Sequence, residues 1–510
     1  MNAETAYLFR HALLRDAAYQ LQLPGDRARL HALAFEIIEQ AFGGRAPEPP
    51  PLDSPSTATF RRHATDQVAH ELAGHAQLAQ QNPGAGRAAM LGVQRLYLRR
   101  AAEYAEVEHR NPAAAHDWQT LATLVDGSDR AECLRRAGVM HNKSGVVATA
   151  EFCLEQALAG ARAFANRRLE GVVLGNTAEL YRETGRVAQA EAAYQQALAI
   201  HREVKNVCFD GIALGSIAAL YRETGRVTQA ETALEQALAI HRETGSRTHE
   251  GIATGSLSIL HQITGRIEQA EQTIIRALAI HREVNNRPFQ GITLGNLAAM
   301  YAETGRVEKA ESAFEQAVAV AREVGDRRFE GVVLGNLALF YLEARRHEQA
   351  ARTFEQSIAI SREVGNRRSE GIGLGNLAIV YKETGRVAQA ESTFEQALAI
   401  HRQVGNAAFE GLTLGNLANL YVDSGRTEQA QQIFERAIAV LRETKNKRFE
   451  GATLCSYGLC LLVRRHGDAR KHWLAGAAIL EEIKDRAELT SKRTAMREAC
   501  AKAGVPPFDA

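Results

Sequence analysis

Apolar side chains recur with helical spacing along most of this chain, and the segment 167–206 shows the pattern clearly. One stripe at i, i+3, i+4 and i+7 consists of Leu174, Thr177, Ala178 and Tyr181, and a second consists of Val187, Ala190, Tyr194, Ala197 and Leu198. Gly185 separates the two stripes, where a helix end commonly needs a left-handed residue. The pattern therefore predicts two amphipathic helices that pair as a hairpin.

The same segment repeats with a period of 40 residues. The period is marked by Glu170-Gly171, Asp210-Gly211, Glu250-Gly251, Gln290-Gly291, Glu330-Gly331, Glu370-Gly371, Glu410-Gly411 and Glu450-Gly451. A fixed period of this length is typical of stacked supersecondary units, because one hairpin cannot bury both of its apolar stripes. The sequence thus predicts an all-α fold, an α-solenoid of antiparallel helical hairpins.

The repeat resembles the tetratricopeptide repeat (TPR). The residues that carry the resemblance are Leu174, Thr177, Ala178, Tyr181, Gly185, Ala190, Tyr194 and Ala197. It departs from that family in its length, which is 40 rather than about 34 residues, and in having Arg202 where the shorter repeat usually has a proline. The sequence pattern from Gly325-Asp326-Arg327 to Asn336-Leu337 is similar to that of the long repeats of LGN/Pins scaffolds and of bacterial signalling regulators. The resemblance implies a protein-binding superhelix.

The N-terminal region carries a second resemblance. Its segments Phe9–Tyr19 and Arg27–His31 resemble the region that follows the ATPase core in bacterial STAND-type regulators and in adenylate cyclases with TPR arms. This resemblance implies a sensor arm, with a separate ATPase, cyclase or other output domain as a candidate partner.

We expect five regions along the chain. They are a helical segment 1–42, a Pro-rich linker or loop 43–59, irregular helices 60–126, about nine 40-residue repeats over 127–486 with degenerate end repeats at 127–166 and 447–486, and a capping helix and tail 487–510.

Length, charge and cysteine content narrow the function. A chain of 510 residues is too long for one core, which agrees with an array. Its formal net charge of +1 and the lack of a long apolar stretch argue against nucleic acid and membrane as partners. Six scattered cysteines form neither a disulfide framework nor a zinc motif, and we expect a cytoplasmic protein without cofactors.

The motifs that suggest chemistry have the wrong spacing. The string Gly138–Ser144 lacks the glycine that precedes lysine in a phosphate-binding loop, and His70 and His75 are five residues apart where a zinc helix needs four. A histidine row, whose members are His201, His241, His281 and His401, is expected on the surface. No singular constellation indicates catalysis, so we expect no catalytic, metal or cofactor site and predict a protein that is not an enzyme.

The face of the first helix opposite its core stripe is the expected binding groove. Its most informative members are Asn176, Asn296, Asn336, Asn376 and Asn416, together with Asn419. Asparagine is a mediocre helix former, and its amide can both donate to and accept from the backbone of an extended peptide, as the ladder of the resembling superhelices does. The alternative is that these amides bond to a neighbouring helix and fix repeat geometry.

Acidic residues and glycines follow the same face. The acidic row consists of Glu183, Glu223, Glu303, Glu343, Glu383 and Asp423, and it favours a basic partner if it lines the groove. Gly171 and Gly175 recur on one flank, which we attribute to close approach by the preceding hairpin.

These observations predict a scaffold or sensor arm of a bacterial signalling or regulatory system that grips a protein or extended peptide. Two alternatives remain open: a receptor whose shape changes when it binds a small ligand or signalling peptide, and an enzyme with a singular pocket. The sequence does not indicate an oligomeric state.

Overall fold

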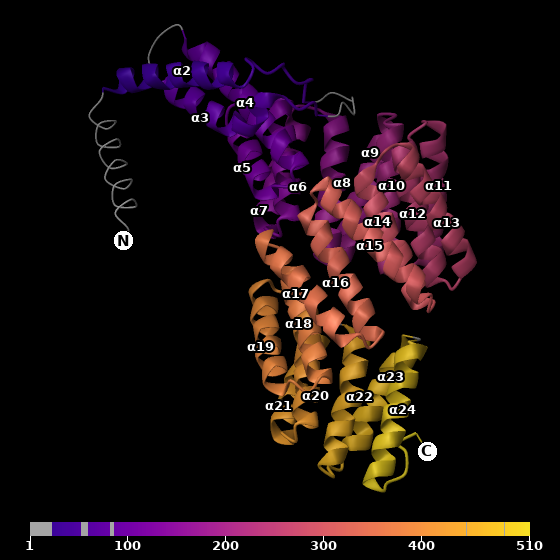
Figure 1. The fold of residues 1–510 in the computed structure, drawn as a ribbon. Coiled ribbons are helices and arrows are strands. Elements are labelled where there is room, and N and C mark those ends of the chain that lie inside the picture. Colours follow the sequence, from indigo (N-terminus) through magenta and orange to yellow (C-terminus); the bar gives the residue numbers. More distant parts are fainter. Residues whose placement is uncertain (1–22, 53–59, 82–85, 445, 484, 510) are drawn as a thin grey trace, which may run out of the picture. The chain divides into compact units, whose positions relative to one another are not determined.

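Helical hairpins follow one another along the chain in the computed structural model (Figure 1). The structure describes residues 23–52, 60–81, 86–444, 446–483 and 485–509, and all regular elements in these ranges are helical. The segment Phe9–Tyr19 lies outside the described residues. The chain divides into two compact units, of which the first ends at Asn286 and the second begins at Arg287.

The first unit contains irregular helices followed by hairpins. The irregular helices are α2 (Pro24–Ala41), the 3-10 helix η1 (Ala64–Val68), α3 (Ala69–Ala79), α4 (Arg87–Val107) and α5 (Asn111–Ala122). The hairpins are α6 (Gly127–Lys143) with α7 (Val147–Ala163), α8 (Arg167–Glu183) with α9 (Val187–Glu203), α10 (Val207–Glu223) with α11 (Val227–Glu243), and α12 (Arg247–Ile263) with α13 (Ile267–Glu283).

The second unit consists of hairpins and a final helix. The hairpins are α14 (Arg287–Glu303) with α15 (Val307–Val324), α16 (Arg327–Glu343) with α17 (His347–Glu363), α18 (Arg367–Glu383) with α19 (Val387–Gln403), α20 (Ala407–Asp423) with α21 (Thr427–Glu443), and α22 (Lys447–Val463) with α23 (Ala469–Glu482). The final helix, α24 (Arg486–Ala503), packs against α22 and α23 and buries Leu489, Met496 and Cys500.

The stretch before η1 is anchored to α4. The Tyr97 hydroxyl donates a hydrogen bond to Glu39 on α2 at 2.7 Å and accepts one from the backbone N–H of Ala46 at 3.3 Å. Burial and the Glu39 carboxylate raise the pKa of Tyr97 to about 12, so the hydroxyl stays protonated. Nearby, the buried Arg100 guanidinium pairs with Asp66 at 2.7 Å.

In five hairpins the turn between the two helices joins the hairpin to the preceding one. Gly185 adopts φ +75°, and the following Arg186 lies over the Tyr181 ring at 4.3 Å. The Arg186 Nη1 atom donates to Glu151 on α7 at 2.7 Å. Equivalent pairs are Arg226 with Glu191, Arg266 with Glu231, Arg346 with Glu311, and Arg426 with Glu391.

The carboxylate of the Glu-Gly pair makes a second, buried connection. Glu370, in the first turn of α18, is 2% exposed and accepts hydrogen bonds from Arg362 on α17 at 2.7 Å and from Arg367 on its own helix. Glu170, Glu250 and Glu330 make the same two contacts. Burial opposes ionisation of Glu170, yet hydrogen bonds from Arg162 and Arg167 keep its pKa below the usual value. This carboxylate therefore fixes how one hairpin sits on the next.

We predict that Glu370→Ala lowers the free energy of unfolding by about 1–3 kcal/mol, because two guanidinium groups lose their shared acceptor. Urea denaturation followed by circular dichroism at pH 7 measures this loss. Glu370→Gln is the matched control, since Gln290 occupies the equivalent position and accepts from Arg287 at 2.7 Å. Equal losses in the two variants would contradict the role of the acceptor.

Candidate functional site

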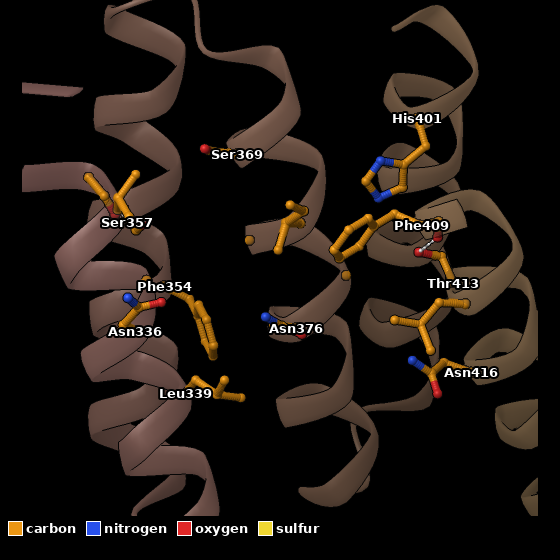
Figure 2. A pocket seen from close by; sticks show the side chains of 17 residues that line it. Asn336, Leu339, Phe354, Ser357, Ser369, Asn376, His401, Phe409, Thr413 and Asn416 are labelled. Atoms are coloured by element: carbon orange, nitrogen blue, oxygen red, sulfur yellow. Dashed lines mark hydrogen bonds between the residues drawn. The ribbon is translucent and has the colours of Figure 1, made fainter. Parts of the chain in front are cut away.

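A pocket of about 370 Å3 opens in the second unit among the first helices α16, α18 and α20 and the second helices α17 and α19 (Figure 2). Its apolar walls include Leu339, Phe354, Ile372, Phe409 and Leu412. Its polar groups come from Asn336, Asn376, Asn416, Ser357, Ser369, His401 and Thr413. This volume is sufficient for a large side chain or a small ligand.

One repeat at the pocket lacks two rings that occupy the equivalent positions of other repeats. In most hairpins a ring lies against the glycine of the Glu-Gly pair. A Cβ built on Gly371 would lie 2.8 Å from His401 Cε1, and one on Gly291 would lie 2.9 Å from Phe329. For Gly331, the positions that correspond to this histidine and phenylalanine hold Ser361 and Ser369. A Cβ on Gly331 would lie 3.1 Å from Ile360 Cγ2 instead of against a ring, and Ser369, in the place of a phenylalanine, lines the pocket. The residues that all repeats share do not predict this difference.

Three of the predicted asparagines converge on this pocket. Figure 2 shows Asn336, Asn376 and Asn416 at a similar level on three neighbouring first helices. Asn336 is exposed and the other two are half-buried. Among the described residues, none of the three amides has a hydrogen-bond partner. Their donors and acceptors are thus available to a ligand.

The other predicted asparagines lie elsewhere. Asn176 on α8 accepts a hydrogen bond from Arg135 Nη1 on α6 at 2.9 Å, which is the neighbouring-helix role expected as the alternative. Asn296 is half-buried on α14, and Asn419 lies one turn beyond Asn416 on α20. Neither of these two lines the pocket.

The acidic row is exposed at the C-terminal ends of the first helices, and most of it is paired within the chain. Glu223 pairs with Arg182, Asp423 with Lys382 at 2.9 Å, Glu383 with Arg345 at 3.0 Å, and Glu183 accepts from Asn142 at 2.8 Å. Glu343 differs, because burial and the neighbouring Glu303 carboxylate raise its pKa.

The expectation that the histidine row lies on the surface is wrong. His201, His241, His281 and His401 are only 1–2% exposed, because each packs on the glycine of its own hairpin. Burial lowers the pKa of all four imidazoles, which are therefore neutral at pH 7. The expectation that Gly171 and Gly175 allow close approach by the preceding hairpin is also wrong. Gly171 accommodates His201 within one hairpin, and a Cβ on Gly175 would meet nothing within 4 Å.

Two hydroxyl groups of the pocket donate to backbone carbonyls of the protein itself. The Ser357 hydroxyl donates to the carbonyl of Gly331 at 2.7 Å, and Thr413 donates to the carbonyl of Phe409 at 2.7 Å. Neither nitrogen of His401 is hydrogen-bonded within the described part of the chain, so no base is set against either hydroxyl.

Within the described ranges, no three His, Cys, Asp or Glu side chains cluster to hold a metal, and no helix is long and apolar enough to cross a bilayer. The two histidines of the zinc-helix comparison, His70 and His75, contact different residues. His70 Nδ1 is 2.8 Å from Asp117, and His75 Nδ1 is 2.8 Å from His31 Nδ1.

Comparison with known proteins identifies one family. The tetratricopeptide-repeat family matches residues 129–203, 210–283, 252–323, 289–363, 329–403 and 369–443, which together make up more than half of the chain. No curated protein matches the sequence.

Several solved structures are similar to this chain. A Rap protein complexed with competence and sporulation factor is 14% identical, with a TM-score of 0.49, over 75% of this chain and 99% of that one. A STAND protein with a tetratricopeptide-repeat sensor from Pyrococcus horikoshii is 14% identical, with a TM-score of 0.48, over 84% and 74%. Aspartyl phosphate phosphatase F from Bacillus subtilis is 14% identical, with a TM-score of 0.43, over 66% and 91%.

The two glycines of α8 give opposite predictions. Gly171→Ala should lower the free energy of unfolding by about 1–3 kcal/mol, because its Cβ would lie 2.7 Å from His201 Cε1. Gly175→Ala should raise it by about 0.5–1 kcal/mol, because alanine favours the helix and the space is open. Thermal and urea denaturation of both variants measure the difference, and a stabilised Gly171→Ala protein would refute the packing argument.

The buried histidines predict a stability that falls with acidification. Their folded pKa values are lowered, so below pH 6.5 the unfolded chain binds protons that the folded chain excludes. Each histidine can then remove at most about 1.4 kcal/mol for each pH unit below 6.5, whereas stability above 6.5 is unaffected.

Urea denaturation at pH 7.5, 6.5 and 5.5 tests this slope. The matched variant replaces the four histidines with leucine, as Leu441 already packs on Gly411. We expect its stability to change less between pH 6.5 and 5.5 than that of the unmodified protein. The same slope in both proteins would show that the histidines do not cause it.

Proposed function

Because this chain belongs to the tetratricopeptide-repeat family, we propose that it is a non-catalytic scaffold that binds an extended segment of a partner protein across α16, α18 and α20. The observation that carries the proposal is the convergence of Asn336, Asn376 and Asn416 on one partly apolar pocket. Unpaired amides can bond to both the N–H and the C=O groups of a peptide backbone, whatever its side chains.

The spacing of the three helices suits a short extended segment. Neighbouring packed helices lie about 8–10 Å apart, so three asparagines span roughly 16–20 Å. An extended chain rises about 3.3 Å per residue and would cross them with about five or six residues. The pocket beside Gly331 would then take one side chain of that segment.

We extend the proposal to a role as the sensor arm of a bacterial signalling or regulatory system. The sequence resemblance of residues 1–42 to the region after a STAND-type ATPase core supports this role. In this proposal an ATPase, cyclase or other output domain on a separate chain responds to the bound segment.

The volume of the pocket also favours a second candidate, a receptor for a small ligand. About 370 Å3 falls within the range of small-molecule sites, and its mixture of apolar walls with few polar groups is typical of them. The two functions differ in what the asparagines bind, a peptide backbone or a discrete molecule.

We predict that replacing Asn336, Asn376 and Asn416 with alanine abolishes peptide binding and leaves helicity unchanged, because the three amides lie on the groove surface and have no protein partner. Selection of a phage-displayed library of random 12-residue peptides on the immobilised full-length protein tests this. The unmodified protein should enrich peptides that the triple variant does not bind, while both give the same circular dichroism.

The matched control replaces Gln316, Gln356 and Gln396 with alanine. These three amides have the same 40-residue spacing but lie exposed on second helices outside the pocket. This variant should keep full binding. Enrichment on the asparagine variant equal to that on the unmodified protein would refute the groove, and no enrichment on any protein would favour the small-ligand receptor.

A further inference from the structure

The array supplies its own cations to the acidic row at two positions of the repeat. One donor lies 41 residues before the acid, as in Arg182 with Glu223 and Lys382 with Asp423. The other lies 38 residues before it, as in Arg345 with Glu383. Three of the six acids in the row thus pair with a cation of the chain.

Glu343 has neither donor. The residues 41 and 38 positions before it are Ala302 and Gly305, and within the described residues its carboxylate makes no ion pair. The charged group that faces Glu343 is another carboxylate, that of Glu303. Glu303 lies at the end of α14 and Glu343 at the end of the neighbouring α16, and the two negative charges repel each other. Both lie at helix C-termini, whose partial negative charge adds to theirs. This end of the groove therefore favours a cation.

The acidic pair lies next to the pocket. Leu339 lines the pocket, is 39% exposed, and precedes Glu343 by four residues on α16, so the two side chains share one face about 6 Å apart along the helix. Ser369 occupies the place where Phe329 and Phe409 lie in adjacent repeats, and it lines the same partly apolar pocket as Leu339 and Phe354. A ligand that reaches the Leu339 end of the pocket lies within about one helical turn of Glu343.

We propose, on the basis of the binding function proposed above, that the partner segment carries a bulky apolar side chain that enters the pocket and, within three residues of it, a lysine or arginine that pairs with Glu343 and Glu303. The apolar side chain replaces the missing phenylalanine of the array, and the basic side chain replaces its missing cation. The long stem of lysine or arginine spans the distance of one helical turn.

The test determines which peptides the unmodified protein selects from the 12-residue library and how variants bind them. We expect peptides with a large apolar residue and a Lys or Arg within three residues. Ala302→Arg installs the cation that the array lacks at this site and should weaken the best synthetic peptide about three- to tenfold in fluorescence anisotropy. Ala302→Gln, of similar length but uncharged, should bind as the unmodified protein does.

Two further variants separate the two parts of the recognition. Glu343→Gln should reduce affinity and also reduce its salt dependence, whereas Glu223→Gln, at an acid already paired with Arg182, should have no effect. Ser369→Phe refills the pocket, so it should remove the preference for the large apolar residue and retain that for the basic one.

The results of these experiments distinguish failure of the apolar-and-basic recognition from failure of the proposed peptide-binding function. Selected peptides without a basic preference, or full affinity in Ala302→Arg, would overturn the inference and leave the groove intact. No enrichment, or enrichment that survives the loss of Asn336, Asn376 and Asn416, would overturn the binding function and the inference with it.

Discussion

The buried carboxylate at the start of most first helices is the interaction on which the stacking of these hairpins depends. In Glu330 and Glu370 it is 1–2% exposed and joins an arginine of the preceding hairpin to an arginine of its own helix. A buried carboxylate is costly unless it is paired, so the angle between successive hairpins is restricted to one that satisfies both arginines. A residue inserted between the arginine of one hairpin and this carboxylate would rotate the carboxylate away from its partners. The pairing therefore favours a constant repeat length of 40 residues.

The stacking contacts and the proposed binding site lie at different ends of the same helices. The carboxylate and its glycine occupy the first turn, whereas Asn336 and Leu339 lie two to three turns later on the groove face. Ser369 can therefore stand in place of the phenylalanine without breaking the carboxylate connection at Glu370. A repeat protein can acquire a specific site in this way at one position and keep its architecture elsewhere.

The sequence predicts the hairpins, the family and the groove face, because these depend on features that every repeat shares. The groove face is identified by the recurrence of asparagine, and the structure brings together Asn336, Asn376 and Asn416. The pocket could not be predicted from that recurrence, because Ser369, which lines it, differs from the phenylalanine at the equivalent position of most repeats. The burial of the histidine row depends on contact with a glycine 30 residues earlier, which a helical period does not reveal.

The nearly neutral net charge of the chain also follows from the repeat. A net charge of +1 reflects carboxylates and guanidinium groups that the repeats place in register, and three of the six acids in the row, Glu223, Glu383 and Asp423, have a cation of the chain as partner. In such an array the total charge says little about a partner, because matched pairs contribute almost no field at a distance. A site where the repeat omits its cation contributes most, and Glu343 is such a site. In the proposed recognition, the preference of this surface depends on the cation that one repeat lacks beside Glu343. The missing cation can be detected because other repeats hold an arginine or lysine at the corresponding positions.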